Sequence, residues 1–280
     1  MNALRLRNER ASFLLFVCAA NAAELALSRA RVLQGVAGLV GAPLLGSEIY
    51  ARLPPVWAPS SLPPLSVPKE TDELILILPG AGGPDANTKR IVAALSSSSS
   101  NVVAEYDWQP FCGDTLRAPY NAQRVGEHIG RELGRLAELR RVHLVGVSVG
   151  AFVADRAVDS YARSGGTSRA ATRLTLLDPF TARGLPGLAR PATAYGIARF
   201  GRAADEAVAL INTDDPVPST SLPLRHCRNL DVTAAAARES FVPLPGDSLH
   251  SWPCAWFGLN RGVLPREAER VARGGVFRVP

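Results

Sequence analysis

Lysine and basic runs are nearly absent from this 280-residue chain. Lys69 and Lys89 are its only lysines, so arginine carries almost all of the positive charge behind a formal net charge of +6. No basic run alternates with aromatic residues in the way that a nucleic-acid groove requires, so no nucleic-acid partner is expected. The arginine excess is compatible with a mild attraction to an anionic membrane surface.

Cysteine is also scarce. The four cysteines, Cys18, Cys112, Cys227 and Cys254, show no C-x-x-C spacing, so a structural zinc site and other metal cofactors are not expected. Cys227 and Cys254 could pair near the end of the sheet. Buried free thiols are the favoured alternative, because an unpaired cysteine behaves as a small apolar residue.

The N-terminal 46 residues do not resemble an enzyme core. Three arginines precede a short apolar run over 11–20, which is too short to span a bilayer comfortably, and a second, glycine-broken run covers 32–45. We predict a leader over 1–46 that makes the protein secreted, organelle-targeted or membrane-associated. A helical pair that packs on the domain is the alternative. A proline-rich linker is predicted over 47–69, and a catalytic domain over 70–280.

Apolar runs alternate with helical patterns throughout the predicted domain. Buried strands are expected over 74–78, 102–108, 142–145, 173–177, 207–211 and 228–233, with helices over about 84–95, 122–136 and 151–161. This alternation predicts an α/β fold, with a mostly parallel sheet covered by helices on both faces.

The most informative stretch is residues 141–152, RVHLVGVSVGAF. Gly146, Ser148 and Gly150 form a G-x-S-x-G pattern between a predicted strand and a predicted helix, which is the context of the nucleophile turn of α/β-hydrolases. The Val149 amide would lie at the helix N-terminus and could donate to an oxyanion. The competing interpretation is a glycine-rich turn that contains an ordinary serine.

A serine nucleophile needs an imidazole base, and the base needs an acid. Only His250, among the four histidines, lies in a predicted loop after the last strand, where an α/β-hydrolase delivers its base. Asp178 ends one predicted strand, and Asp214 and Asp215 end the next. Topology leaves these carboxylates open as the acid, because each lies at the carboxyl end of a parallel strand.

These segments together resemble the pancreatic-type lipases and phospholipases A1 over about residues 74–257. The resemblance rests on Asp107-Trp108, on Tyr120-Asn121, on the nucleophile segment 142–151 and on Leu177-Asp178-Pro179. It implies Ser148 as nucleophile, Asp178 rather than the later aspartates as acid, His250 as base, and the Ala81 and Val149 amides as oxyanion hole. Val147 and Pro79 stand where the family usually has histidine, and there is little room for a lid between Val232 and His250.

The expected function is therefore hydrolysis of a carboxylic ester, with a lipid as the expected substrate class and no cofactor or metal. Two alternatives share the predicted fold. One is an acyltransferase, in which an alcohol rather than water resolves the acyl-enzyme, and the other is a non-catalytic lipid-binding protein.

Overall fold

A computed structural model describes residues 49–53, 62–97, 101–164, 169–183, 195–245 and 247–280. Residues 1–53 and 54–280 form separate compact units, and every described strand belongs to the second. The predicted leader and Cys18 lie outside the described residues, as do residues 54–61 of the predicted linker. No helix in the described part of the chain is long and apolar enough to cross a membrane.

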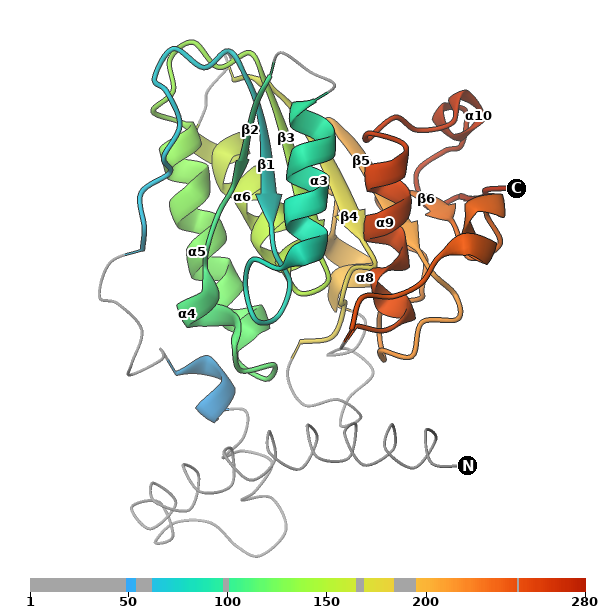
Figure 1. Ribbon diagram of the computed structural model, residues 1–280. Helices are drawn as coiled ribbons and strands as arrows, with labels where there is room; N and C mark the ends of the chain where they lie inside the picture. The colour runs from blue at the N-terminus through green and yellow to red at the C-terminus, as the bar shows by residue number, and fades with distance from the viewer. Residues whose placement is uncertain (1–48, 54–61, 98–100, 165–168, 184–194, 246) are drawn as a thin grey trace, which may run out of the picture. The chain divides into compact units, whose positions relative to one another are not determined.

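The second unit contains a seven-stranded parallel sheet (Figure 1). Its strands are β1 (Glu73–Leu78), β2 (Val102–Glu105), β3 (Arg141–Val147), β4 (Ala171–Leu177), β5 (Glu206–Ile211), β6 (Arg228–Asp231) and β7 (Val276–Arg278), in the spatial order β2-β1-β3-β4-β5-β6-β7. The α/β prediction is confirmed. The sequence missed only β7 among these strands, and the other predicted runs agree with the structure to within a few residues.

Helices pack on both faces of the sheet (Figure 1). Two amphipathic helices, α5 (Ala118–Leu133) and α6 (Gly150–Ser164), cover one face with α4 (Gln109–Cys112) and α8 (Tyr195–Arg199). The opposite face is covered by α3 (Ala86–Ser96) and α9 (Trp252–Leu259), with α10 (Arg266–Glu269) near β6. Two short 3₁₀ turns, η2 (Ala236–Ser240) and η3 (Leu249–Ser251), precede α9.

Burial explains why these segments form the core. The central strands β1, β3, β4 and β5 are almost entirely buried, as expected for parallel strands that helices cover on both faces. Helix α3 begins with a capping box, in which the Asp85 carboxylate accepts the Thr88 N–H at 2.8 Å. Helices α5 and α6 approach closely at Gly126, which has no side chain. A Cβ atom at this position would lie only 2.6 Å from the Val153 carbonyl oxygen.

The segment before β1 contacts the domain. Leu62, Leu65 and Val67 pack against the α5/α6 side of the core, and the Tyr106 hydroxyl donates to the Pro63 carbonyl at 2.7 Å. The last residues of the predicted linker therefore lie against the sheet-bearing unit. The described cysteines, Cys112, Cys227 and Cys254, are buried free thiols, as favoured from the sequence.

The winding direction of the sheet reverses at β1. The chain goes from β1 outward to β2 and then returns to the other side of β1 to form β3. In open α/β sheets, the carboxyl ends of the strands at such a switch point are the usual ligand-binding edge. The segments that follow β1 and β3, including Ser148, meet at this edge.

Candidate active site

Ser148 occupies a strained turn between β3 and α6. Its φ is 52°, in the left-handed region that non-glycine residues rarely adopt. The Ser148 N–H donates to the Leu177 carbonyl at 3.0 Å, and the Ser148 carbonyl accepts from the Phe180 N–H at 3.1 Å. These bonds to the end of β4 hold the backbone in a conformation that costs about 1–3 kcal/mol.

The two glycines of the motif are required by packing. A Cβ on Gly150 would lie 2.2 Å from the Leu78 carbonyl oxygen, and a Cβ on Gly146 would lie 2.9 Å from the Ala151 Cα. Both contacts are with backbone, which cannot rotate away. The absence of a side chain at Gly150 lets the turn approach the end of β1, and its absence at Gly146 lets β3 approach the first turn of α6.

The loop after β1 lies beside the serine. A Cβ on Gly80 would lie 3.3 Å from the Ser148 Cβ, so the two backbones are almost in contact. The buried Trp108 indole fixes this loop by donating to the Pro79 carbonyl at 2.9 Å. Within the described chain, no acceptor takes the Ala81 or Val149 N–H. Both amides predicted to form an oxyanion hole thus remain available on the loops that flank Ser148.

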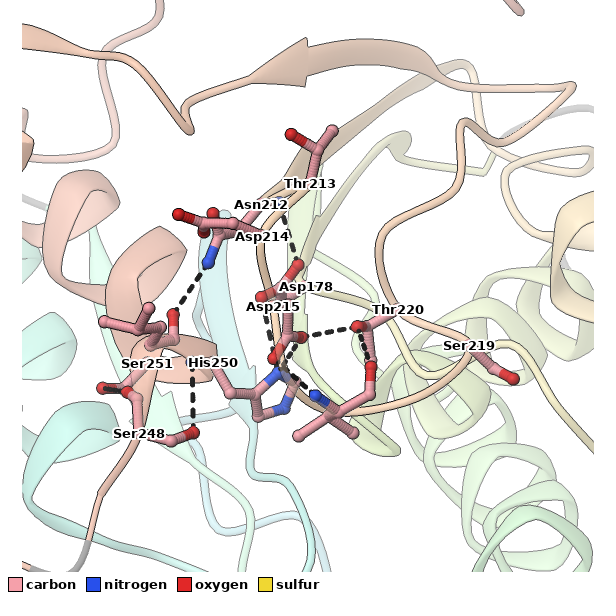
Figure 2. A network of polar contacts seen from close by, with 12 residues as sticks. Asp178, Asn212, Thr213, Asp214, Asp215, Ser219, Thr220, Ser248, His250 and Ser251 are labelled. Atoms are coloured by element: carbon pink, nitrogen blue, oxygen red, sulfur yellow. Dashed lines mark hydrogen bonds and ion pairs between the residues drawn. The ribbon is translucent and has the colours of Figure 1, made fainter. Parts of the chain in front are cut away.

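His250 lies in η3, directly before α9, and its imidazole faces two carboxylates (Figure 2). His250 Nδ1 is 2.7 Å from Asp215 Oδ2 and 3.4 Å from Asp178 Oδ2. The first distance is that of a strong charge-assisted hydrogen bond, and the second is that of a longer ion pair. The structure brings Asp178 and Asp215 together at the same nitrogen, whereas the resemblance implied Asp178 alone.

Asp215 is held by contacts beyond the imidazole. Its Oδ1 accepts the Val217 N–H at 2.9 Å, and its Oδ2 also accepts the Thr220 hydroxyl (Figure 2). Its side chain is completely buried. A carboxylate with three donors is stabilised as an anion, which suits it to orient an imidazole and to balance the charge of the imidazolium.

Asp178 has a different environment. It is 1% exposed and, like Ser148, adopts a positive φ, of 44°. Its Oδ1 accepts the Asn212 N–H at 3.1 Å, whereas its buried Oδ2 accepts no hydrogen bond from the described residues. Asp178 is therefore the less satisfied of the two carboxylates and faces His250 without a full hydrogen bond.

The titration behaviour of the group follows from burial and mutual charge. Burial lowers the pKa of His250, but the two carboxylates more than offset this effect and raise that pKa to about 9. Burial raises the pKa of Asp178 to about 7, and the nearby Asp215 charge adds to this rise. Burial also acts to raise the pKa of Asp215, but the bonds from His250 and Thr220 keep it below the ordinary value. Asp215 is consequently the more strongly ionised partner.

The remaining candidates lie away from this group. Asp214 is exposed and pairs with Arg238 at 3.3 Å. His128 contacts the Pro63 carbonyl, His143 contacts Thr175 inside the sheet, and His226 contacts the Ala198 carbonyl. Only His250 among the histidines contacts a carboxylate within the described residues. Its Nε2 has no hydrogen-bond partner there, and the Ser148 hydroxyl is not bonded to it.

Sequence reasoning missed Asn212, which joins the two sides of the group. Asn212 is fully buried, its backbone N–H donates to Asp178, and its side-chain amide donates to the Leu249 carbonyl at 3.0 Å (Figure 2). Ser248 adds a second contact, since its hydroxyl accepts the His250 N–H at 3.2 Å. A polar residue that directly follows the apolar run of β5 was the available signal for Asn212.

Donor atoms of Asp178, Asp215 and His250 lie within 4.8 Å of one another, so these three residues could also hold a metal ion. Two carboxylates and one imidazole suit a divalent cation, but binding would require Nδ1 to lose its proton. The metal would then replace the hydrogen bond between His250 and Asp215.

No known protein-family model matches this chain, and no curated protein matches it either.

Proposed function

We propose that the protein hydrolyses carboxylic esters through an acyl-enzyme on Ser148, within an α/β-hydrolase fold. The observation that carries the proposal is the His250 imidazole, which buried carboxylates hold through Nδ1 at the same sheet edge as the strained Ser148 turn. Fixing Nδ1 as the protonated nitrogen leaves Nε2 as the base, which is the arrangement that serine hydrolases require.

In the proposed first half-reaction, Ser148 Oγ attacks the ester carbonyl carbon while His250 Nε2 takes the hydroxyl proton. The carbonyl π electrons move onto oxygen, and the Ala81 and Val149 amides stabilise this oxyanion. When the tetrahedral intermediate collapses, the ester C–O bond breaks, and the imidazolium gives its proton to the departing alcohol. Water then attacks the acyl-serine by the same steps in reverse and releases the acid.

We assign the orienting acid to Asp215 on its 2.7 Å bond to Nδ1. Asp178, which the family resemblance favours, is proposed as a second carboxylate that raises the basicity of the imidazole without the direct bond. The order Ser148, then aspartate, then His250 along the chain agrees with α/β-hydrolases for either acid.

Lipid esters are the proposed substrate class, and this choice rests on the resemblance of residues 74–257 to lipases and phospholipases A1. Product analysis in the presence of an added alcohol would test it against acyl transfer. Release of free acid alone supports hydrolysis. If an ester of the added alcohol is the main product, the function is acyl transfer and not hydrolysis.

A fluorophosphonate probe provides the direct test, because it reacts only with an activated serine. We expect labelling of the full chain at Ser148 and none in Ser148→Ala. Ser219→Ala is the matched control, since Ser219 also has a positive φ, of 67°, but lies outside the proposed triad. A folded protein that the probe does not label would favour the non-catalytic lipid-binding alternative.

A further inference from the structure

A hollow lies at the opposite end of the sheet from Ser148. Its volume is about 890 Å³, and it is lined by the amino-terminal residues of β1, β3, β4 and β5, by the end of α3 and by residues 261–264 after α9. None of the residues proposed for ester hydrolysis lines it. Its chemistry is therefore independent of the proposed active site.

The shortness of α9 explains why this part of the sheet is uncovered. Helix α9 has eight residues and spans about 12 Å. Its buried side chains Trp252, Trp256 and Phe257 belong to the same core cluster as Val145, Leu177 and Leu210, which lie toward the carboxyl ends of their strands, and Phe257 also reaches His143. The amino-terminal part of this face is left to line the hollow.

Polar residues occupy the floor, where an apolar row would be expected. Ile75, His143, Arg173 and Glu206 are successive register partners across β1, β3, β4 and β5, so their side chains project from the same face of the sheet. Ile75 belongs to the core on the α3/α9 side, which identifies that face. The His143 ring packs edge-on against Phe257, with 6.4 Å between the ring centroids, so Arg173 is the polar residue in the middle of this row whose presence packing does not explain.

Arg173 is the least satisfied of these residues. It is half-buried, its Nε is fully buried and without a hydrogen bond, and no described carboxylate lies within ion-pair distance of it. Burial lowers the pKa of Arg173, as expected for a cation removed from water. An unpaired, partly desolvated guanidinium is unfavourable, and an oxyanion ligand would remove that cost.

Four arginines and four acidic side chains line the hollow. Two of its acids are already neutralised, because Glu73 pairs with Arg141 and Asp205 pairs with Arg169. Arg228 lies one row from Arg173 on the same face, in register with Val208. Among the described residues, Arg173, Arg228 and Arg261 form no ion pair, and neither do Glu206 and Glu269, which lie near Arg173. Arg228 donates to the Glu269 carbonyl at 3.2 Å, which leaves Arg173 as the arginine with a buried donor to satisfy.

His143 does not add to this charge. It is half-buried in the sheet, and its Nε2 lies 2.8 Å from the Thr175 hydroxyl. Burial and the neighbouring Arg173 lower the pKa of His143 to about 3, so its imidazole is neutral at physiological pH. The neutral ring can donate or accept a hydrogen bond beside Arg173, but it contributes no positive charge to the binding of an anion.

We propose that this hollow is a binding site for an anionic amphiphile, with a carboxylate or phosphate group on Arg173 and an apolar body along Val263, which is 69% exposed, and Leu264. Guanidinium groups bind both oxyanions through paired N–H donors. The apolar lining on the same side of the sheet gives the chain of the ligand a surface to cover.

The test uses the full chain carrying Ser148→Ala, so that an ester-cleaving site cannot alter the probe. Calorimetric titration with dodecyl phosphate, laurate and inorganic phosphate, below the micelle concentration, measures the contributions of head group and tail. We expect dodecyl phosphate or laurate to bind at least tenfold more tightly than inorganic phosphate. Equal affinity for inorganic phosphate and dodecyl phosphate would overturn the amphiphile, because the tail would then contribute nothing.

Arg173→Gln should weaken binding of the amphiphile at least tenfold. Arg141→Gln is the matched control, since Arg141 lines the same hollow but is exposed and paired with Glu73, and it should change the affinity less than twofold. Unchanged affinity in Arg173→Gln would overturn the site. If this variant does not fold, the NMR resonance of the Arg173 Nε–H group in the Ser148→Ala chain provides the test. Saturating dodecyl phosphate should shift this resonance, and an unchanged resonance would overturn the site.

Discussion

Asp178 and Asp215, at the ends of neighbouring strands, each direct one carboxylate oxygen at the same nitrogen of His250. Asp215 makes the shorter contact and has the other hydrogen bonds, whereas Asp178 has a buried oxygen without a hydrogen bond among the described residues. The proposed base thus faces two acids, one whose carboxylate oxygens are hydrogen-bonded and one with a carboxylate oxygen that lacks a hydrogen bond. The two acids should respond differently to substitution.

Replacing the direct acid should have the larger effect on catalysis. We expect Asp215→Asn to lower kcat by about 10⁴, the loss found when the triad aspartate of a serine protease is replaced in the same way. Asp178→Asn should lose much less, because the bond from His250 to Asp215 remains. Asp214→Asn is the control, since Asp214 is exposed and pairs only with Arg238 among the described residues. The kcat of all three variants is measured with one soluble ester at saturating concentration. If Asp178→Asn is inactive and Asp215→Asn is active, Asp178, directly after β4, is the orienting acid.

The pH profile should report the second carboxylate. His250 must be neutral to accept the Ser148 proton, and its pKa is raised to about 9, so kcat/KM should rise with pH until about pH 9. Removing a negative neighbour destabilises the imidazolium. Asp178→Asn should therefore shift the rising limb toward lower pH, and a profile that is unchanged in this variant would contradict a role of Asp178 at His250.

Asn212 should behave as a positioning residue. Asn212→Ala removes the bond to the Leu249 carbonyl but keeps the backbone N–H that Asp178 accepts. We expect a loss of about 1–3 kcal/mol in unfolding free energy, because a buried acceptor loses its donor. We also expect a lower kcat with little change in KM, since His250 loses part of its support. Asn87→Ala is the control. It removes an exposed hydrogen bond from the Asn87 side-chain amide to Asp247 and should change stability and kcat little. Equal effects in both variants would argue against a role of Asn212 in positioning His250.

Metal ions should inhibit the proposed ester hydrolysis and should not be required for it. Because a divalent cation at Asp178, Asp215 and His250 would displace the Nδ1 proton, Zn²⁺ should lower activity in competition with protons, more strongly at higher pH. Treatment with EDTA should leave the hydrolysis rate unchanged. Loss of activity on chelation, restored by one metal ion, would instead assign the three side chains to a metal centre.

The sequence predicts the central sheet well, because runs such as Leu74–Leu78 are continuous apolar segments bounded by turn residues. It does not predict β7, a three-residue edge strand, or α9, whose sequence WPCAWFGL is apolar on all sides and has no helical periodicity. Ser148 and His250 could be proposed as nucleophile and base because each stands in a distinctive sequence context. The choice of acid could not be made from strand ends alone, because Asp178 and Asp215 end adjacent strands and only their side-chain directions distinguish them.

The strand order divides the proposed site between two regions of unequal stability. The nucleophile and oxyanion loops follow β1 and β3 at the centre of the sheet, whereas the segment that holds His250 lies between β6 and β7, which have four and three residues at one edge. Short edge strands open at lower free energy than central ones. On heating, the base should therefore be lost while the nucleophile turn is still folded. Ester hydrolysis should stop several degrees below the main unfolding transition, which makes activity a sensitive measure of opening at this edge.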